Sequence, residues 1–249
     1  MLLLPRIASG QEPSAQPVQE LFFTEVVYPQ DRGELQLTLG ARIDRAESPS
    51  SALVPFAVEY GITDRWQVEA GWDSYSKGES SPFSDLHTAR LSLGTKYSLM
   101  NIAHSRVHAA FGTEFEFPQA SALDEGEGGM EIEPFMALAA DLGRHLTVFG
   151  SAAASIQARQ AAEVIGDERP DDRGTLGAGA LVAYRRVTVA VEYTNRSDGL
   201  PWRLDGSSLL TPSIVIHPHG TWELGAGFPI GLHGRHQAGF VINIVKEFG

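Results

Sequence analysis

The chain has 249 residues, a formal net charge of −12 and no cysteine. The lack of cysteine excludes disulfides, thiolate metal sites and cysteine nucleophiles. An acidic chain repels phosphates, so no nucleic-acid partner is expected. No stretch approaches the roughly 18 consecutive apolar residues of a membrane helix, which excludes a helical membrane protein.

The first nineteen residues are predicted to form a leader outside the folded domain. Residues 1–6 hold an apolar run too short for an export signal, and the small and polar residues 7–11 are like the end of one. A truncated signal peptide and a plain disordered tail explain this equally well. We therefore expect a truncated signal-like or disordered leader at 1–19 and one domain at 20–249.

From Glu34 onward the dominant pattern has a period of two. Every odd position of 34–44 is apolar, and every even one is polar or glycine. Such alternation gives a strand one apolar and one polar face. The pattern recurs and predicts twelve strands, at 34–44, 53–61, 66–75, 87–99, 106–117, 131–142, 146–157, 174–185, 187–195, 208–217, 221–231 and 238–248.

The connections alternate between short and mostly longer segments. Strands of about ten residues with this loop rhythm are typical of a transmembrane β-barrel, in which the sheet closes because lipid cannot bond a free backbone edge. We predict an all-β fold, a single antiparallel transmembrane β-barrel of about twelve strands with short periplasmic turns and longer extracellular loops. The short connections lie near 62–65, 100–105, 143–145, 185–187 and 217–220.

Aromatic residues on the apolar face favour this barrel over a soluble β-fold. They fall near the strand ends, as membrane interfaces favour, whereas a soluble core would place them centrally. The set beside the short turns and the C-terminus is Tyr60, Trp66, Tyr97, Tyr184, Trp222 and Phe248, and the opposite set is Phe115, Phe117 and Tyr193.

The polar face, which would line the lumen, holds thirteen acids and four fixed cations, among them Arg185. An acidic lumen concentrates cations. Arg90 is expected opposite Glu114, either as a structural salt bridge or as a selectivity cluster. Many small lumenal residues indicate either strand bending or free space for a solute. The hypothetical solute pathway comprises Arg42, Glu69, Asp73, Arg90, Glu114, Glu133 and Glu192.

Motifs for catalysis, cofactors and metals are weak. No phosphate loop or dinucleotide fingerprint occurs, so no cofactor is expected. The two histidine pairs, His217 with His219 and His233 with His236, read as turn residues. The segment 195–199 resembles the active-site neighbourhood of outer-membrane phospholipase A, but Glu192-Tyr193-Thr194 stands where its His-x-Ser would be. A hydroxyl without its base is not activated, so we predict no enzyme.

Three stretches carry a family resemblance: Thr24-Glu25, the segment 55–69 with its Tyr-Gly-Ile-Thr-Asp-Arg-Trp hairpin, and Pro212 with 225–229. They resemble the outer-membrane "MetA-pathway of phenol degradation"-type transporter-like barrels of Gram-negative bacteria, loosely over residues 20–249. The resemblance implies outer-membrane passage of small, often aromatic, compounds and supplies no catalytic residue. The terminal strand with Phe248 likewise resembles the assembly signal of outer-membrane proteins.

These observations predict a channel or transporter for small solutes in the bacterial outer membrane, with an acidic, cation-preferring lumen. A non-conducting structural or partner-docking barrel is the alternative, and an outer-membrane lipid hydrolase is a third possibility. The expected partners are outer-membrane lipid, a small-molecule solute or cation, and the barrel-assembly machinery during biogenesis.

Overall fold

The computed structural model describes residues 17–18, 20–44, 51–77, 87–118, 130–157, 172–198, 206–233 and 238–249. Within these residues the chain forms one antiparallel sheet of thirteen strands and a single turn of 3-10 helix, η1 (Ile102–His104). None of the described helical structure is long and apolar enough to cross a membrane. The strands are β1 (Leu35–Asp44), β2 (Ser51–Thr63), β3 (Trp66–Lys77), β4 (His87–Leu99), β5 (Val107–Pro118), β6 (Glu131–Asp141), β7 (Leu146–Gln157), β8 (Arg173–Tyr184), β9 (Val187–Asp198), β10 (Ser207–Ile216), β11 (Trp222–Gly227), β12 (Ile230–His233) and β13 (Gly239–Phe248).

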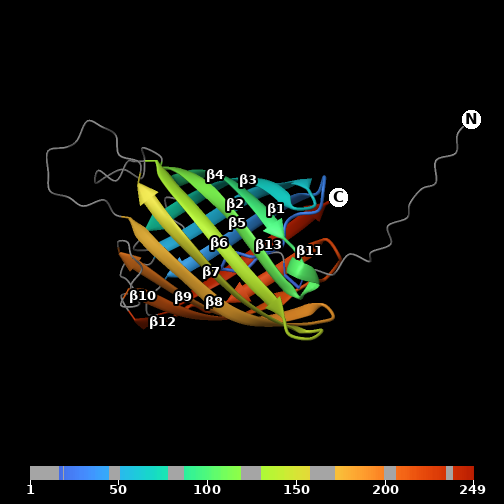
Figure 1. The fold of residues 1–249 in the computed structure, drawn as a ribbon. Helices are drawn as coiled ribbons and strands as arrows, with labels where there is room; N and C mark the ends of the chain where they lie inside the picture. Colours follow the sequence, from blue (N-terminus) through green and yellow to red (C-terminus); the bar gives the residue numbers. More distant parts are fainter. Residues whose placement is uncertain are drawn as a thin grey trace, which may run out of the picture.

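The sheet closes into a barrel. Each strand from β1 to β10 pairs with the next, β10 pairs with β11 and β12, and β11 pairs with β13. Strand β13 completes the ring on β1, with Leu35 opposite Phe248 and Asp44 opposite Gly239. Among the described strands, every strand except β12 is paired on both sides, and closure of the sheet is the condition for it to sit in lipid. The predicted all-β antiparallel barrel is confirmed (Figure 1).

The two ends of the barrel differ. The connections 64–65, 100–106, 142–145, 185–186 and 217–221 lie at one end together with the C-terminus, and we call it the turn end. The strand ends that flank the longer connections lie at the opposite end, the loop end. This is the predicted rhythm of short and long connections, and the strand boundaries agree with the predicted ones within three residues, except for the eleventh strand.

The eleventh predicted strand, at 221–231, is wrong as one element. It is broken into β11 and β12 at Phe228 and Pro229. Proline has no N–H to donate to a ladder, so it interrupts strand pairing. The break is bridged by Phe228 N–H donating to the Pro212 carbonyl at 3.0 Å, and β12 continues on β10 with a register shift.

The predicted pairing of β4 with β5 is also wrong. Arg90 lies opposite Pro118, four residues beyond the expected Glu114. The connection is longer and differently shaped than assumed, because Asn101, Ala103 and His104 all adopt left-handed backbone conformations around η1. A shift of four residues is even, so the same side chains still face the lumen.

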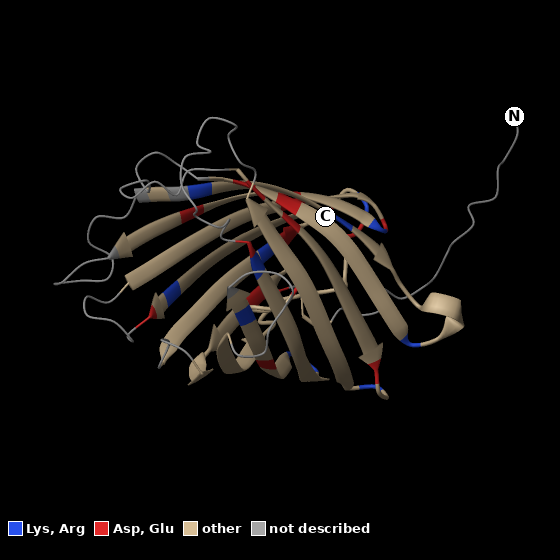
Figure 2. Cartoon of the chain, turned by 60° about the vertical axis from the view of Figure 1, so that its left-hand side comes forward, with Lys and Arg blue, Asp and Glu red and all other residues tan. Residues whose placement is uncertain are grey.

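The outward face is apolar and carries the predicted aromatic residues. Trp66, Tyr97, Tyr184 and Phe248 are all exposed on the barrel surface, and Phe115 and Phe117 are exposed near the loop end. The ribbon in Figure 2 is tan over most of its length, with short charged segments on the strands and turns. Arg185, expected in the lumen, instead lies in the β8–β9 turn with its guanidinium 5.4 Å from the Tyr184 ring centre.

Candidate solute pathway and inner segment

The residues before β1 run inside the barrel. We call residues 17–34, of which 19 is not described, the inner segment. Val18 is fully buried, and Val26, Val27 and Tyr28 are buried at 9% exposure or less. They pack against small lumenal residues of the wall, and this cluster forms an apolar core at the turn end. The wall side of the cluster is Ala110, Ala137, Ala139, Leu181, Ala190 and Val215.

The inner segment enters near β9 and turns at mid-lumen. The Pro17 carbonyl accepts a 2.6 Å hydrogen bond from Thr188, close to the turn end of β9. Farther along β9, the Glu192 carboxylate accepts the backbone N–H groups of Phe22 at 3.1 Å and Phe23 at 2.9 Å. The Phe23 ring lies 4.9 Å from the Arg42 guanidinium of β1. At Phe22 and Phe23 the inner segment therefore contacts both β9 and β1.

The returning limb is held by a network of amides and carboxylates. Gln30 donates two hydrogen bonds to the wall: its backbone N–H to the Gln67 side-chain oxygen at 3.0 Å, and its side-chain amide to the Gln36 oxygen at 2.6 Å. Gln36 donates in turn to Glu59 at 2.8 Å and to Glu20 at 3.2 Å. This network joins both limbs of the inner segment to β1, β2 and β3.

Lumenal glycines make room for the inner segment. A Cβ on Gly177 would stand 3.0 Å from the Thr24 side chain, and Cβ atoms on Gly225 and Gly227 would stand 3.0 and 3.2 Å from the Phe22 ring. Wall side chains come closer still at two of these positions, Ser151 at Gly177 and Asn243 at Gly225. The expectation that such small residues leave free space for a solute on this wall is therefore corrected. The inner segment occupies that space.

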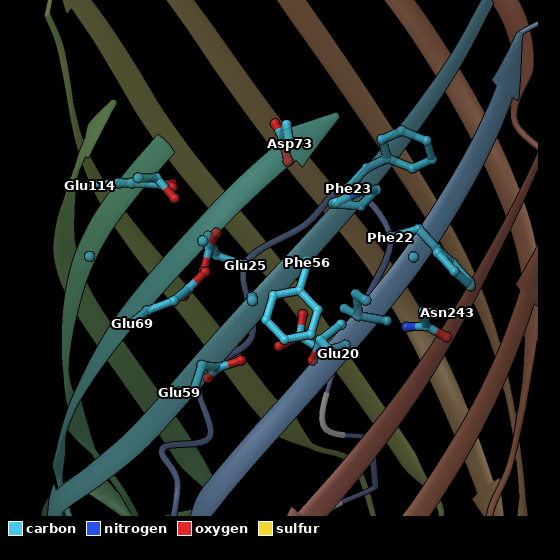
Figure 3. A pocket seen from close by; sticks show the side chains of 18 of the residues that line it. Glu20, Phe22, Phe23, Glu25, Phe56, Glu59, Glu69, Asp73, Glu114 and Asn243 are labelled. Atoms are coloured by element: carbon cyan, nitrogen blue, oxygen red, sulfur yellow. The ribbon is translucent and has the colours of Figure 1, made fainter. Parts of the chain in front are cut away.

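A cavity of about 410 Å³ lies between the inner segment and the wall of β1 to β5 and β13 (Figure 3). In Figure 3 Glu25 of the inner segment lies beside Glu69 of β3, and Phe22 and Phe23 lie on the opposite side of the view. Seven carboxylates line the cavity against three cations. The carboxylates are Glu20, Glu25, Glu59, Glu69, Asp73, Glu114 and Glu116, and the cations are Arg42, Arg90 and Lys96.

Two of these cations are already paired. The Arg42 Nε lies 3.0 Å from Asp44. Arg90 contacts Asp73 at 2.5 Å and Glu116 at 2.7 Å, so the expected Arg90–Glu114 salt bridge is replaced by a different one. The replacement follows from the register shift between β4 and β5.

Three of the cavity carboxylates, together with Glu133 beyond the cavity, form a row across the sheet. Glu59 lies directly opposite Glu69, Glu69 opposite Gly94, Gly94 opposite Glu114, and Glu114 opposite Glu133. Like charges directly opposite one another destabilise a sheet, so fold stability does not explain this arrangement. Because barrel strands are tilted, a row across them climbs the wall, here from Glu59 near the turn end to Glu133 near the loop end.

The structure thus brings five of the seven predicted pathway residues to one cavity: Arg42, Glu69, Asp73, Arg90 and Glu114. Glu133 extends the carboxylate row beyond the cavity. Glu192 lies on the other wall, where it anchors the inner segment.

Sequence reasoning missed Glu20, Glu25 and the whole inner segment. Burial inside the barrel and the neighbouring Glu59 carboxylate raise the pKa of Glu20 well above its usual value. The available signal was the unexplained apolar residues of 21–28, which lack strand alternation yet precede a barrel whose lumenal wall is rich in glycine.

The described residues contain no group of three or more histidine, aspartate or glutamate side chains arranged to hold a metal ion. His217 pairs with Glu223 at 2.7 Å. His108 Nδ1 accepts the Asn101 N–H at 3.1 Å, and its Nε2 lies 3.1 Å from the Asp141 carboxylate. Both histidines therefore have structural partners near the turn end.

The closed antiparallel sheet with its apolar outer face defines the class of the fold as an all-β barrel. No family model matches the chain, and no curated protein matches it by sequence. Solved structures do match: a KdgM porin (TM-score 0.60, 8% identity, 86% of this chain and 99% of that one) and a NanC porin (0.60, 12%, 86% and 99%). A COG4313 outer membrane channel from Pseudomonas putida F1 matches with a TM-score of 0.59 and 12% identity over 90% of this chain and 100% of that one. At these identities the likeness establishes the fold.

Proposed function

We propose that this chain is a bacterial outer-membrane channel for small solutes whose lumen prefers cations. The observation that carries the proposal is the cavity with seven carboxylates against three cations, inside a closed barrel with an apolar outer face. Negative charge in a confined lumen raises the local concentration of cations and repels anions. The porins and channels with the same fold support a transport role.

The inner segment favours one alternative, a barrel that does not conduct. Its buried valines pack against the wall at the turn end, and Glu192 anchors it farther inside the lumen. A channel with this structure conducts only when the inner segment moves or when solutes pass beside it. The non-conducting role is therefore the second candidate, and conductance separates the two.

The experiment is reconstitution of the purified chain into planar bilayers, with single-channel current recorded in asymmetric salt. We expect cation-selective current that becomes less selective in Glu69→Gln and Glu114→Gln, with Asp64→Asn in the exposed β2–β3 turn as the charge-matched control. Stable insertion without current in all preparations would favour the structural role. Anion-selective current would contradict the cation preference.

We propose no enzymatic role. Ser197, the hydroxyl of the phospholipase-like stretch, is 1% exposed. Its Oγ lies 3.4 Å from the Gly174 carbonyl, and Glu192 is engaged with the inner segment. The remaining partners stay proposals: lipid on the apolar outer face, and the barrel-assembly machinery on β13 with its outward Phe248. The kinship with the MetA-pathway type of barrel also stays a prediction.

A further inference from the structure

The turn end of the barrel is basic, although the chain as a whole is acidic. Its five short connections hold five arginines and a single carboxylate, that of Asp64, whereas the formal charge of the whole chain is −12. All five arginines are exposed, and blue segments lie at this end of the barrel in Figure 2. They are Arg65, Arg106, Arg144, Arg185 and Arg186.

The charge of these arginines is not neutralised within the part of the chain that the structure describes. None of the ion pairs there involves any of the five. Two of them donate to neutral groups instead: Arg106 to a backbone carbonyl at 3.3 Å and Arg186 to another at 3.1 Å. The positive charge at the turn end is therefore available to an anionic partner outside the chain.

The arginines lie at the depth at which a bilayer presents its phosphates. Arg65 directly precedes Trp66, and Arg185 directly follows Tyr184, and both aromatic side chains are exposed on the outer face. Trp and Tyr settle at the boundary between hydrocarbon and headgroups, so a guanidinium one residue closer to the turn end meets the headgroups. The guanidinium binds phosphate well because it donates two parallel hydrogen bonds.

An apolar groove on the outer face begins beside one of these arginines. It has a volume of about 460 Å³ and crosses β3, β4 and β5. Three exposed rings stand in a row, with Trp66 opposite Tyr97 and Tyr97 opposite Phe111. The short side chains of Thr95 and Thr113, which lie opposite each other on the side away from the turn end, form the floor.

The shape of the groove is fixed by contacts within the wall. Trp66 Nε1 donates to Thr95 Oγ1 at 2.7 Å, and that hydroxyl donates to the Gln67 carbonyl at 3.0 Å. The Tyr97 and Phe111 ring centres are 5.5 Å apart. The polar atoms of Trp66 and Thr95 are therefore paired inside the wall, and what the groove offers a ligand is mainly hydrocarbon and ring surface. This surface suits an acyl chain.

The groove and the nearest arginine have the polarity of a lipid in a leaflet. The Arg65 carbonyl accepts the Ser98 N–H at 2.7 Å, which fastens the β2–β3 connection beside Tyr97 at the groove. A phosphate on the Arg65 guanidinium would lie at the turn end, and a chain attached to it would run past the rings and over the threonine pair toward the middle of the barrel wall.

We propose that this groove and Arg65 together bind one anionic phospholipid of the leaflet at the turn end. One acyl chain lies over Thr95 and Thr113, and the phosphate contacts Arg65. The inference rests on the membrane location in the proposed function and goes beyond it, because it names the chemistry, the leaflet and the position of a lipid on the outer face.

The test is native mass spectrometry of the full chain, freed of lipid in detergent and titrated with phosphatidylglycerol. Phosphatidylcholine with the same acyl chains is the comparison lipid. We expect phosphatidylglycerol to bind at least about fivefold more tightly, the usual gain from one arginine facing an anionic lipid. Equal affinity for the two lipids would overturn the proposal. Displacement of the lipid by equimolar inorganic phosphate would also overturn it, since the acyl chain would then contribute nothing.

Two variants separate the headgroup contact from the groove. Arg65→Gln should lower the phosphatidylglycerol affinity about fivefold, and Arg186→Gln, in the β8–β9 connection, is its charge-matched control. Thr113→Phe should fill the groove and lower the affinity about tenfold without changing any charge. Val189→Phe, on the outer face of β9, is the control for an added ring.

The heat-dependent shift of folded barrels in electrophoresis identifies the variants that fold, and Arg65→Gln suffices if Thr113→Phe does not. An equal loss in Arg186→Gln would show general charge attraction, and an equal loss in Val189→Phe would show a general effect of the outer face. Either result would overturn the site.

Lipid binding and conduction are measured independently. Phosphatidylglycerol binding that requires Arg65 and the open groove, in a protein that carries no current in bilayers, would leave the lipid site standing and remove the channel function. Cation-selective current in a protein without preference for the anionic lipid would do the reverse.

Discussion

Glu192 holds Phe23 at the point where the inner segment turns inside the barrel, through a 2.9 Å hydrogen bond from the Phe23 N–H to the carboxylate. The same carboxylate accepts the N–H of Phe22 at 3.1 Å. Both N–H groups belong to the inner segment and lie inside the lumen, where small residues of the wall leave room for its backbone. The buried Glu192 side chain of β9 therefore fixes the turn of the inner segment at Phe22 and Phe23.

Replacing Glu192 by alanine should release the inner segment. Loss of hydrogen bonds to a charged acceptor costs about 1.5–3 kcal/mol, which shifts the balance between seated and released forms roughly 10- to 150-fold. We expect longer or more frequent open events in planar bilayers. Thr188→Val, which removes only the contact to Pro17, should have the smaller effect. An unchanged current record in Glu192→Ala would count against the anchor.

A disulfide between Thr24 and Gly177 positions should lock the inner segment in place. A Cβ on Gly177 would stand 3.0 Å from Thr24 Oγ1, where a sulfur at position 24 would lie, which suits a disulfide once the Ser151 hydroxyl, 2.7 Å from that Cβ, rotates away. The sequence has no cysteine that could compete. We expect the oxidised Thr24→Cys, Gly177→Cys protein to conduct less than its reduced form. The two single-cysteine variants are the controls. If current were equal before and after reduction, movement of the inner segment would not be needed for conduction.

Raising the pH should loosen the inner segment. Because the pKa of Glu20 is raised by burial and by Glu59, the seated form favours neutral Glu20. The stabilisation is fully present below the ordinary carboxyl pKa and is lost as the pH rises through the raised pKa. Glu59 and Glu69 oppose the charge that then appears, and Lys96 partly offsets it.

The measurement is open probability between about pH 4 and about pH 9, in wild type and in Glu20→Gln. Wild type should open more at high pH, and the glutamine variant should show a flatter profile because it cannot ionise. A profile of the same steepness in both proteins would assign the pH dependence to another group.

Replacing Arg90 by methionine should raise cation selectivity and lower stability. Arg90 is paired with both Asp73 and Glu116, and its loss leaves two unpaired carboxylates in the cavity. Its side chain is 38% exposed, so the stability lost is about 1 kcal/mol. Reversal potentials in asymmetric salt and the temperature of the electrophoretic shift report the two effects. A fall in cation selectivity would contradict the assigned role of this charge cluster.

The alternation of apolar and polar residues was enough to predict the barrel. A period of two assigns each side chain to one of two faces, and aromatic residues such as Trp66 and Tyr184 identified the outer one. These are local properties, so strand positions and the acidic lumen could be deduced without coordinates. Glu69, Asp73 and Arg90 occupy lumenal positions of this alternation, and in the structure they line one cavity.

Pairing and the lumen contents depended on contacts between distant residues. The turn at 100–106 sets the register of β4 and β5, and its left-handed residues at Asn101 and Ala103 shift the partner of Arg90 by four. The inner segment has no alternation because it is not part of the sheet, and its place depends on Glu192, Gln67 and the wall glycines far along the chain. A local pattern determines which face a residue occupies, and only the folded barrel determines what fills the space that those faces enclose.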